Sequence, residues 1–235
     1  LNDKRPSTYS EREWIINKYI LPHIGHLNLR NVKNEHVSNL YDIVRALSPS
    51  VLEHTHKVLN RMFQFAIENE ICITVNPISV GLLKQVRGAV HSANNDKAIY
   101  AGLSLEDIDY ILLEVRGHRH EIIFHFQILH GLRIGEALGV KWEDIDFENC
   151  WLNVNRQVSN VSKSKMQSTK WAIGNGPIIT PPKTGRSRRS VPLQEATKIL
   201  LEKTSVQERS NFIYCTANGN PHMVNNFRRD VFNPL

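Results

Sequence analysis

Apolar and polar residues in the first part of the chain recur with the period of a helix. Ser10 and Glu13 have the spacing of a capping box, which predicts a first helix over REWIINKYIL. Pro22 and Gly25 are expected to end this helix, because neither residue continues a helix well. The residues expected to face inward are Trp14, Ile15 and Tyr19.

Two further helices follow from the same periodicity. Asn34 is a candidate cap for EHVSNLYDIVRAL, and Ser48 or Ser50 for VLEHTHKVLNRMFQFAIEN. The inward positions predicted for the first of these are Val37, Leu40, Tyr41 and Val44. Those predicted for the second are Val51, Thr55, Val58, Met62, Phe65 and Ala66. A short fourth helix is expected near residues 80–87.

The periodicity then lapses and returns in a different form. Residues 88–100 (GAVHSANNDKAIY) collect Gly, Ser, Asn and Asp, so we predict a linker over 88–103 between a helical domain at 1–87 and a second domain at 104–235. The second domain opens with a helix capped by Ser104 and Asp107, followed by the apolar helix EIIFHFQIL. Strand-like segments come next: WLNVNRQV, IIT and RSVPL. The prediction is a mainly α fold with a small antiparallel sheet, of the α+β class.

Composition and charge limit the classes of partner and of cellular compartment that the chain suits. Hydrophobic residues make up 41% of the 235, which suits a packed globular protein. The net charge of +6 and the pI near 9.3 favour an anionic partner, either nucleic acid or an acidic membrane surface. The three cysteines lie far apart with no metal-ligand spacing, so neither a metal site nor a disulfide framework is expected. Without a membrane-length apolar run or a signal peptide, the prediction is a cytoplasmic protein.

The stretch HGLRIGEALGVKWEDID, which begins at His130, places Arg133 at the start of a predicted helix, directly after an apolar run and a glycine. A guanidinium there can hold two phosphate oxygens at once, with a fork geometry that lysine lacks. Glu136 lies three residues on and can orient it. From this pair alone, an ordinary ion pair on a surface helix is the competing interpretation.

The stretch PPKTGRSRRSVPL, which begins at Pro181, places Lys183 on the rising arm of a basic hairpin. A solvated surface turn is the competing interpretation here. No acidic residue occurs from Asn149 to Gln194, whereas this span carries eight positive charges, an arrangement that favours a polyanion. The basic residues are Arg156, Lys163, Lys165, Lys170, Lys183, Arg186, Arg188 and Arg189.

Both stretches closely resemble the catalytic half of the tyrosine recombinases, the integrases of phages and conjugative transposons. The resemblance implies that Arg133 clamps the scissile phosphate, supported by Glu136, and that Lys183 acts as general acid to the 5′-oxygen of the leaving strand. It also implies a HxxR box and a nucleophilic tyrosine that forms a 3′-phosphotyrosine bond. The chain ends at Leu235, before the positions where the family has both, so the catalytic domain is expected to be incomplete and inactive alone. His222 is an unfavoured substitute for the box, and Tyr214 is expected to pack in the core.

The N-terminal helices resemble the family's core-binding domain, which closes around duplex DNA. His54, Lys57, Arg61 and Gln64 are spaced so that they project together from the third helix, as a DNA-reading face would. The solvent side of any amphipathic helix has the same pattern. The residues predicted to contact DNA are Lys57, Arg61, Lys84, Arg87, Arg186 and Arg188.

The function predicted is that of a site-specific DNA recombinase that integrates or excises a mobile element, without cofactor or metal. Its partners would be double-stranded DNA and further integrase subunits, assembling from dimer to tetramer on the DNA. The alternative is a truncated or degenerate integrase that binds DNA without cleaving it. A type IB topoisomerase and an RNA-binding module are less favoured, because the motif is integrase-like and no aromatic platform for stacking bases is visible.

Overall fold

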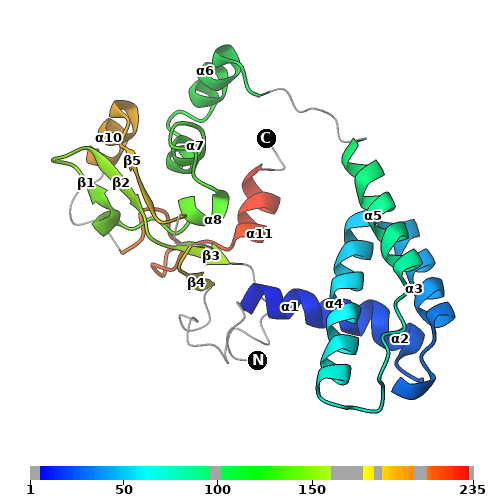
Figure 1. Ribbon diagram of the computed structural model, residues 1–235. Coiled ribbons are helices and arrows are strands. Elements are labelled where there is room, and N and C mark those ends of the chain that lie inside the picture. Colours follow the sequence, from blue (N-terminus) through cyan, green and yellow to red (C-terminus); the bar gives the residue numbers. More distant parts are fainter. Residues whose placement is uncertain (1–5, 96–101, 160–176, 183–186, 204–210, 233–235) are drawn as a thin grey trace. The chain divides into compact units, whose positions relative to one another are not determined.

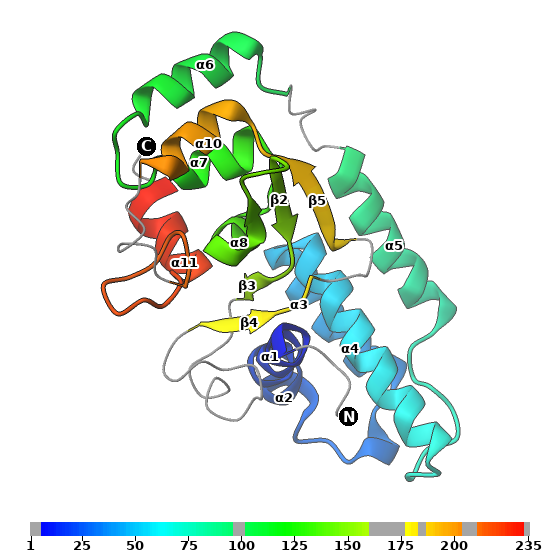
Figure 2. The same ribbon diagram turned by 90° about the vertical axis from the view of Figure 1, so that its left-hand side faces the viewer.

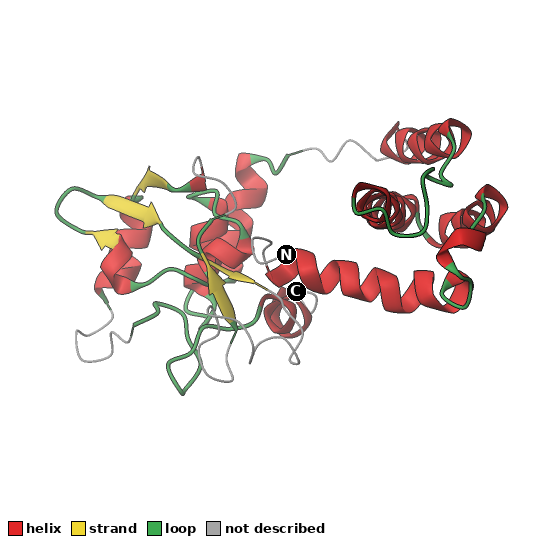
Figure 3. Cartoon of the chain, turned by 60° about the horizontal axis from the view of Figure 1, so that its bottom comes forward, coloured by secondary structure: helices red, strands yellow, loops and turns green. Residues whose placement is uncertain are grey.

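The computed structural model describes residues 6–95, 102–159, 177–182, 187–203 and 211–232. The chain divides into two compact units, Leu1–Ala101 and Gly102–Leu235. The described part of the first unit is helical, whereas the second combines helices with short strands (Figure 3). No helix in the described ranges has the length and apolar character to span a bilayer. The mainly α prediction with small antiparallel sheets is confirmed.

The first unit opens with a long helical stretch, drawn in dark blue in Figure 1. It consists of α1 (Pro6–Ile15), a π-helical segment η1 (Ile16–Ile20) and α2 (Leu21–Ile24). The predicted cap at Ser10 is wrong, because the helix already begins at Pro6, and proline suits a first helical position. Pro22 does not end the helix either, since it lies within α2, directly after the π-helical segment. The helix ends at Gly25, as predicted.

The core of this unit forms where α3 (Asn34–Leu47) and α4 (Pro49–Glu68) pack together, after a short 3₁₀ turn η2 (Leu29–Asn31). All four inward positions predicted for α3 are buried. On α4, Met62 and Phe65 are 43% and 50% exposed, so the predicted stripe is wrong at these two positions. The helix turns a neighbouring face to α3 and α5. The buried residues of α4 are Leu52, Thr55, His56, Val58, Leu59, Phe63 and Ala66.

Helix α5 (Val80–Asn95) packs along α4 and runs eight residues beyond the predicted end at residue 87. The first residues of the predicted linker, 88–95, are therefore helical. The stretch after Arg87 is weak in intrinsic helix propensity, but Ala89 packs against the core of the first unit. Tertiary packing outweighs the local preference of residues such as Gly88.

The second unit begins with α6 (Leu105–Glu114), whose predicted Ser104–Asp107 capping box is present. Among the described residues of this unit, the other helices are α7 (Glu121–Ile128), α8 (Ile134–Ala137), α10 (Glu195–Glu202) and α11 (Val224–Phe227), with a 3₁₀ turn η3 (Trp142–Asp144) and a π-helical segment η6 (Arg228–Phe232). Helices α7 and α10 lie side by side in Figures 1 and 2 and are in contact.

The described part of the second unit also contains two small antiparallel sheets. One has the order β1 (Ile145–Asp146), β2 (Trp151–Val154), β5 (Arg189–Pro192), and the other pairs β3 (Gln157–Ser159) with β4 (Ile178–Thr180). Strands β2 and β5 run side by side in Figure 2, in a register that sets Leu152 opposite Val191 and Val154 opposite Arg189. This register brings Arg189, the first residue of β5, within hydrogen-bonding distance of α8.

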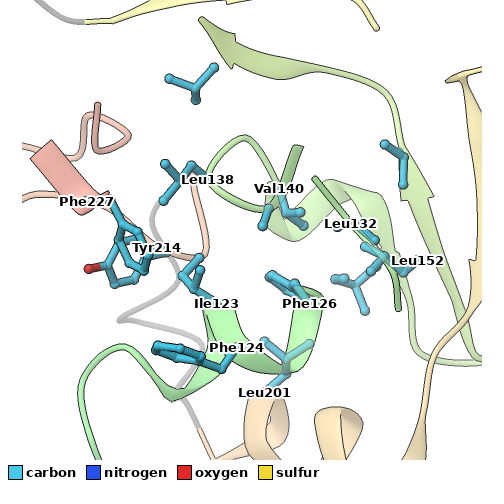
Figure 4. Close-up of a cluster of buried hydrophobic side chains, with 14 of the residues drawn as sticks. Ile123, Phe124, Phe126, Leu132, Leu138, Val140, Leu152, Leu201, Tyr214 and Phe227 are labelled. Carbon is cyan, nitrogen blue, oxygen red and sulfur yellow. The ribbon is translucent and has the colours of Figure 1, made fainter. Parts of the chain in front are cut away.

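The core of the second unit lies around α7, as Figure 4 shows. Ile123, Phe124 and Phe126 from α7 meet Leu201 of α10 and Leu152 of β2. Tyr214 and Phe227 close the cluster, with their rings edge to face at 6.0 Å. The tyrosine hydroxyl is hydrogen-bonded to Nδ1 of the buried His120. Tyr214 is therefore a core residue, as predicted.

Acidification is expected to destabilise this unit through His120. Burial lowers the pKa of His120 to about 4, with Arg119, His118 and His222 acting in the same direction. An unfolded histidine has a pKa near 6.5, so between these values the unfolded chain binds a proton that the folded chain excludes. The contribution of His120 to the free energy of unfolding is therefore fully present above about pH 6.5. It decreases as the pH falls, by about 1–2 kcal/mol between pH 7 and pH 5.

Urea unfolding at the two pH values, followed by tryptophan fluorescence, measures this loss. His120→Gln removes the titrating group, and its pH dependence should be smaller by the His120 contribution. An equally steep pH dependence in this variant would show that His120 is not the group responsible.

Candidate active site

The turn between α7 and α8 fixes the backbone of Arg133. Gly131 has φ +62°, a left-handed conformation that costs glycine little. The N–H of the buried Leu132 then donates to the carbonyl of Phe126 at 3.0 Å, which ties the turn to α7. Arg133 follows in an extended conformation as the N-cap residue of α8, so it lies at the start of a helix as predicted.

Close packing against β3 fixes α8 itself. A Cβ at Gly135 would lie 2.7 Å from the carbonyl oxygen of Val158, so only glycine allows this approach. Ala137 and Leu138 are buried on the same short helix. The side chains at its start are therefore carried by a fixed backbone.

Glu136 is the centre of the site. Its side chain is only 1% exposed, and its Oε1 accepts from Nη1 of Arg133 at 2.9 Å. Its Oε2 accepts from the backbone N–H of Arg133 at 3.0 Å. Burial raises the pKa of Glu136, but hydrogen bonds from Arg189 and Arg133 outweigh this effect and hold the pKa below its ordinary value. The Arg133–Glu136 pair is thus a buried carboxylate aligning a guanidinium whose side chain is 72% exposed.

Arg189, which the sequence reasoning did not single out, is the second arginine on this carboxylate. Its Nη2 donates to Oε2 of Glu136 at 3.0 Å, and its Nη1 donates to Oε1 at 3.3 Å. The contact spans 53 positions in the sequence. The sequence shows Arg189 only as one of the eight basic residues between Asn149 and Gln194. Its contact with Glu136 depends on the β2–β5 register.

Lys183 and Arg186 lie outside the described residues, so the predicted positions of both remain predictions. Arg188 is described and is exposed, just before β5. Within the described ranges, no group of His, Cys, Asp or Glu side chains is arranged to hold a metal ion.

A second buried carboxylate, that of Asp144, pairs with Arg156, one of the eight basic residues between Asn149 and Gln194. Asp144 accepts a hydrogen bond from Nη1 of Arg156 and, at 2.9 Å, from Nδ2 of Asn155. It also accepts from the backbone N–H of Lys141 at 2.8 Å. Nη2 of Arg156 contacts Glu143 at 2.8 Å. Arg156 and Arg189 are therefore paired within the fold, which leaves fewer charges of this stretch for a polyanion than the sequence count predicts.

Arg156→Gln should destabilise the second unit by about 2 kcal/mol, because the buried Asp144 then keeps neutral donors but loses its guanidinium. The matched control is Arg188→Gln, which removes an exposed arginine and should change the free energy of unfolding by less than about 0.5 kcal/mol. Urea unfolding of both variants measures the difference. Equal losses in the two would contradict the assignment of Arg156 as the partner of a buried charge.

The predicted DNA-reading face of α4 is exposed at Lys57 and Arg61, and each cation has an acidic neighbour on the same helix. Nζ of Lys57 lies 2.5 Å from Oε1 of Glu53, and Nη1 of Arg61 lies 3.3 Å from Oε1 of Glu68. His54 pairs with Glu11 of α1. These exposed pairs are weak and can exchange for phosphates, so they do not decide between a DNA-reading face and a solvated one.

The structure brings Lys57 and Arg87 to one pocket between α4 and α5. Glu53, His56 and His91 line it with them, together with apolar residues of α5. Lys84 is exposed one turn before Arg87. Lys57 and Arg87 thus line one pocket, together with the Glu53 carboxylate that pairs with Lys57.

The comparisons with known proteins decide the family. Residues 103–233 match the Phage integrase family, and residues 2–43 match the N-terminal SAM-like domain of phage integrases. The chain belongs to the phage integrase family. One relative, a tyrosine recombinase XerC-like protein of Caldanaerobacter subterraneus subsp. tengcongensis, is 34% identical over 105 residues, covering 44% of this chain and 26% of that protein. The ICEBs1 integrase of Bacillus subtilis is 24% identical over 204 residues, covering 86% of this chain and 50% of that protein.

Solved integrase structures share the fold. The Tn1549 transposon integrase, in complex with transposon right end DNA, aligns with a TM-score of 0.72 at 20% identity, over 96% of this chain and 70% of that one. A lambda integrase dimer bound to a COC′ core site aligns with a TM-score of 0.54 at 14% identity, over 93% of this chain and 54% of that one. The matched part of this chain spans about a quarter of the length of the XerC-like relative and about half of the length of the ICEBs1 integrase.

Proposed function

We propose that this integrase-family protein is a site-specific recombinase that cuts and rejoins DNA through a 3′-phosphotyrosine intermediate, to integrate or excise a mobile element. The observation that carries the proposal is the exposed Arg133 guanidinium aligned by the buried carboxylate of Glu136. A protein that only binds DNA has no need of a buried carboxylate to align one arginine, which favours this function over a non-cleaving integrase. The names of its relatives, an ICEBs1 integrase and a Tn1549 transposon integrase, support the link to mobile elements.

In the proposed reaction, Arg133 binds the non-bridging oxygens of the scissile phosphate and stabilises the charge that builds up when a tyrosine attacks phosphorus. The bond to the 5′-oxygen breaks as the phosphotyrosine bond forms, and Lys183 donates a proton to that oxygen. The reverse attack by a 5′-hydroxyl rejoins the strands. One phosphoester replaces another at each step, so the proposed reaction needs no ATP.

The HxxR box and the tyrosine have no assigned residue in this sequence, so we propose that these 235 residues do not cleave DNA alone. Double-stranded DNA is the proposed partner, contacted through Lys57, Arg61, Lys84, Arg87, Arg186 and Arg188. Further integrase subunits would join on the DNA, as a dimer to tetramer, in the cytoplasm with the nucleoid. The relatives solved on DNA, including a lambda integrase dimer, support this assembly.

The test is induced expression of the intact protein in the cell that encodes it, followed by long-read sequencing of the DNA. The expected result is a new junction at one fixed sequence, absent from uninduced cells. Enrichment of the protein at particular DNA sites with no new junction would support a non-cleaving DNA-binding integrase instead.

A further inference from the structure

Two guanidinium groups share the carboxylate of Glu136. Arg189 binds both oxygens with its two terminal nitrogens, at 3.0 and 3.3 Å. Arg133 binds Oε1 through Nη1 at 2.9 Å and Oε2 through its backbone N–H. Among the described residues, the Arg133 guanidinium forms its side-chain hydrogen bond and ion pair with Glu136. Arg189 thus occupies the carboxylate in a fork, and Arg133 uses one terminal nitrogen.

The charge of this cluster depends on Arg189. One carboxylate and one guanidinium make a neutral pair, which attracts a phosphodiester weakly. With the second guanidinium the cluster carries one net positive charge, and the exposed member of the cluster is Arg133. Since Glu136 is almost fully buried, solvent does little to screen its charge. Without Arg189, this carboxylate would be expected to draw Arg133 into a neutral two-bond pair.

Arg189 also connects two parts of the site along the chain. It is the first residue of β5 and lies three residues after Arg186 and six after Lys183. Its Nη2 reaches the carbonyl of Gly131 at 3.3 Å, in the turn that places Arg133. The start of β5 is therefore hydrogen-bonded to the turn that carries Arg133.

We propose that Arg189 is a positioning residue for DNA cleavage: it offsets the negative charge of Glu136, so that this carboxylate does not cancel the positive charge of the Arg133 guanidinium, which stays aimed at the scissile phosphate. This inference rests on the proposed function. Arg189 itself is not expected to contact the phosphate, because both of its terminal nitrogens are engaged by Glu136, Gly131 and Ser187.

The test measures single-turnover cleavage by the intact protein on a duplex of the junction sequence recovered above, nicked so that the cut strand is trapped. Arg189→Gln should slow cleavage at saturating DNA about tenfold or more, with the Kd for DNA changed less than about threefold. Adding Glu136→Gln to this variant removes the uncompensated carboxylate and should restore cleavage at least about threefold over Arg189→Gln alone. A purely structural role for Arg189 predicts no such recovery.

The possible failures are distinguishable. If the wild-type protein does not cleave, the proposed function fails. If it cleaves but Arg189→Gln matches its rate, or the double variant is no faster than Arg189→Gln, the role of Arg189 is overturned. Should Arg189→Gln melt below the assay temperature, Arg189→Lys provides the same test, since it keeps the charge. It should then cleave at more than about a tenth of the wild-type rate, and a slower rate would overturn the proposal.

Discussion

Replacing Arg133 with alanine in the intact protein is expected to slow DNA cleavage by at least about a hundredfold, while the Kd for DNA stays within about tenfold. In the proposed mechanism the guanidinium acts on charge that develops only in the transition state, whereas the other proposed DNA contacts would still hold the duplex. Single-turnover cleavage and DNA binding, measured on the same duplex, separate the two effects.

The matched control is Arg116→Ala, which removes another exposed arginine of the second unit that has no proposed role. Its cleavage rate should stay within about twofold of the wild type, because the site is untouched. Cleavage by Arg133→Ala at the rate of this control would remove Arg133 from the proposed mechanism.

Replacing Phe126 with alanine is expected to lower the free energy of unfolding of the second unit by about 3–5 kcal/mol. Phe126 is fully buried at the centre of the cluster in Figure 4, on the helix that leads into the Arg133 turn. Its ring lies edge to face with His130 at 6.1 Å, and its carbonyl accepts from Leu132. The loss combines the transfer of the ring to water with the cavity left in a packed core.

Phe65→Ala is the control for this prediction, because the same ring is removed from a side chain that is half exposed. Its effect should stay below about 1 kcal/mol. Urea unfolding of both variants measures the difference. A large loss for Phe65→Ala would mean that the sequence-predicted inward stripe of α4 is right and the observed face is not.

Local signals in the sequence predicted the features that a few neighbouring residues determine. Three such features depend on contacts within one helical turn: the Ser104–Asp107 capping box, the end of the first helix at Gly25, and the pairing of Arg133 with Glu136. Such contacts follow from residue spacing alone, because the helix period brings those positions together.

Features that depend on distant packing were missed. Helix α5 extends to Asn95 although its local sequence is a weak helix former, because Ala89 packs against the core of the first unit. Met62 and Phe65 are as apolar as the buried residues beside them, so the pattern does not reveal which face α3 and α5 cover. Arg189 meets Glu136 only through the register of β2 and β5, which the segment WLNVNRQV does not specify.

The measurement that tests the central claim most directly is capture of a covalent complex between the intact protein and the nicked junction duplex. The proposed function predicts that denaturant-resistant protein remains attached to the 3′ end of the cut strand, that the other end is a free 5′-hydroxyl, and that Arg133→Ala forms no such complex. Cleavage that leaves no protein attached, or protein attached to the 5′ end, would contradict it.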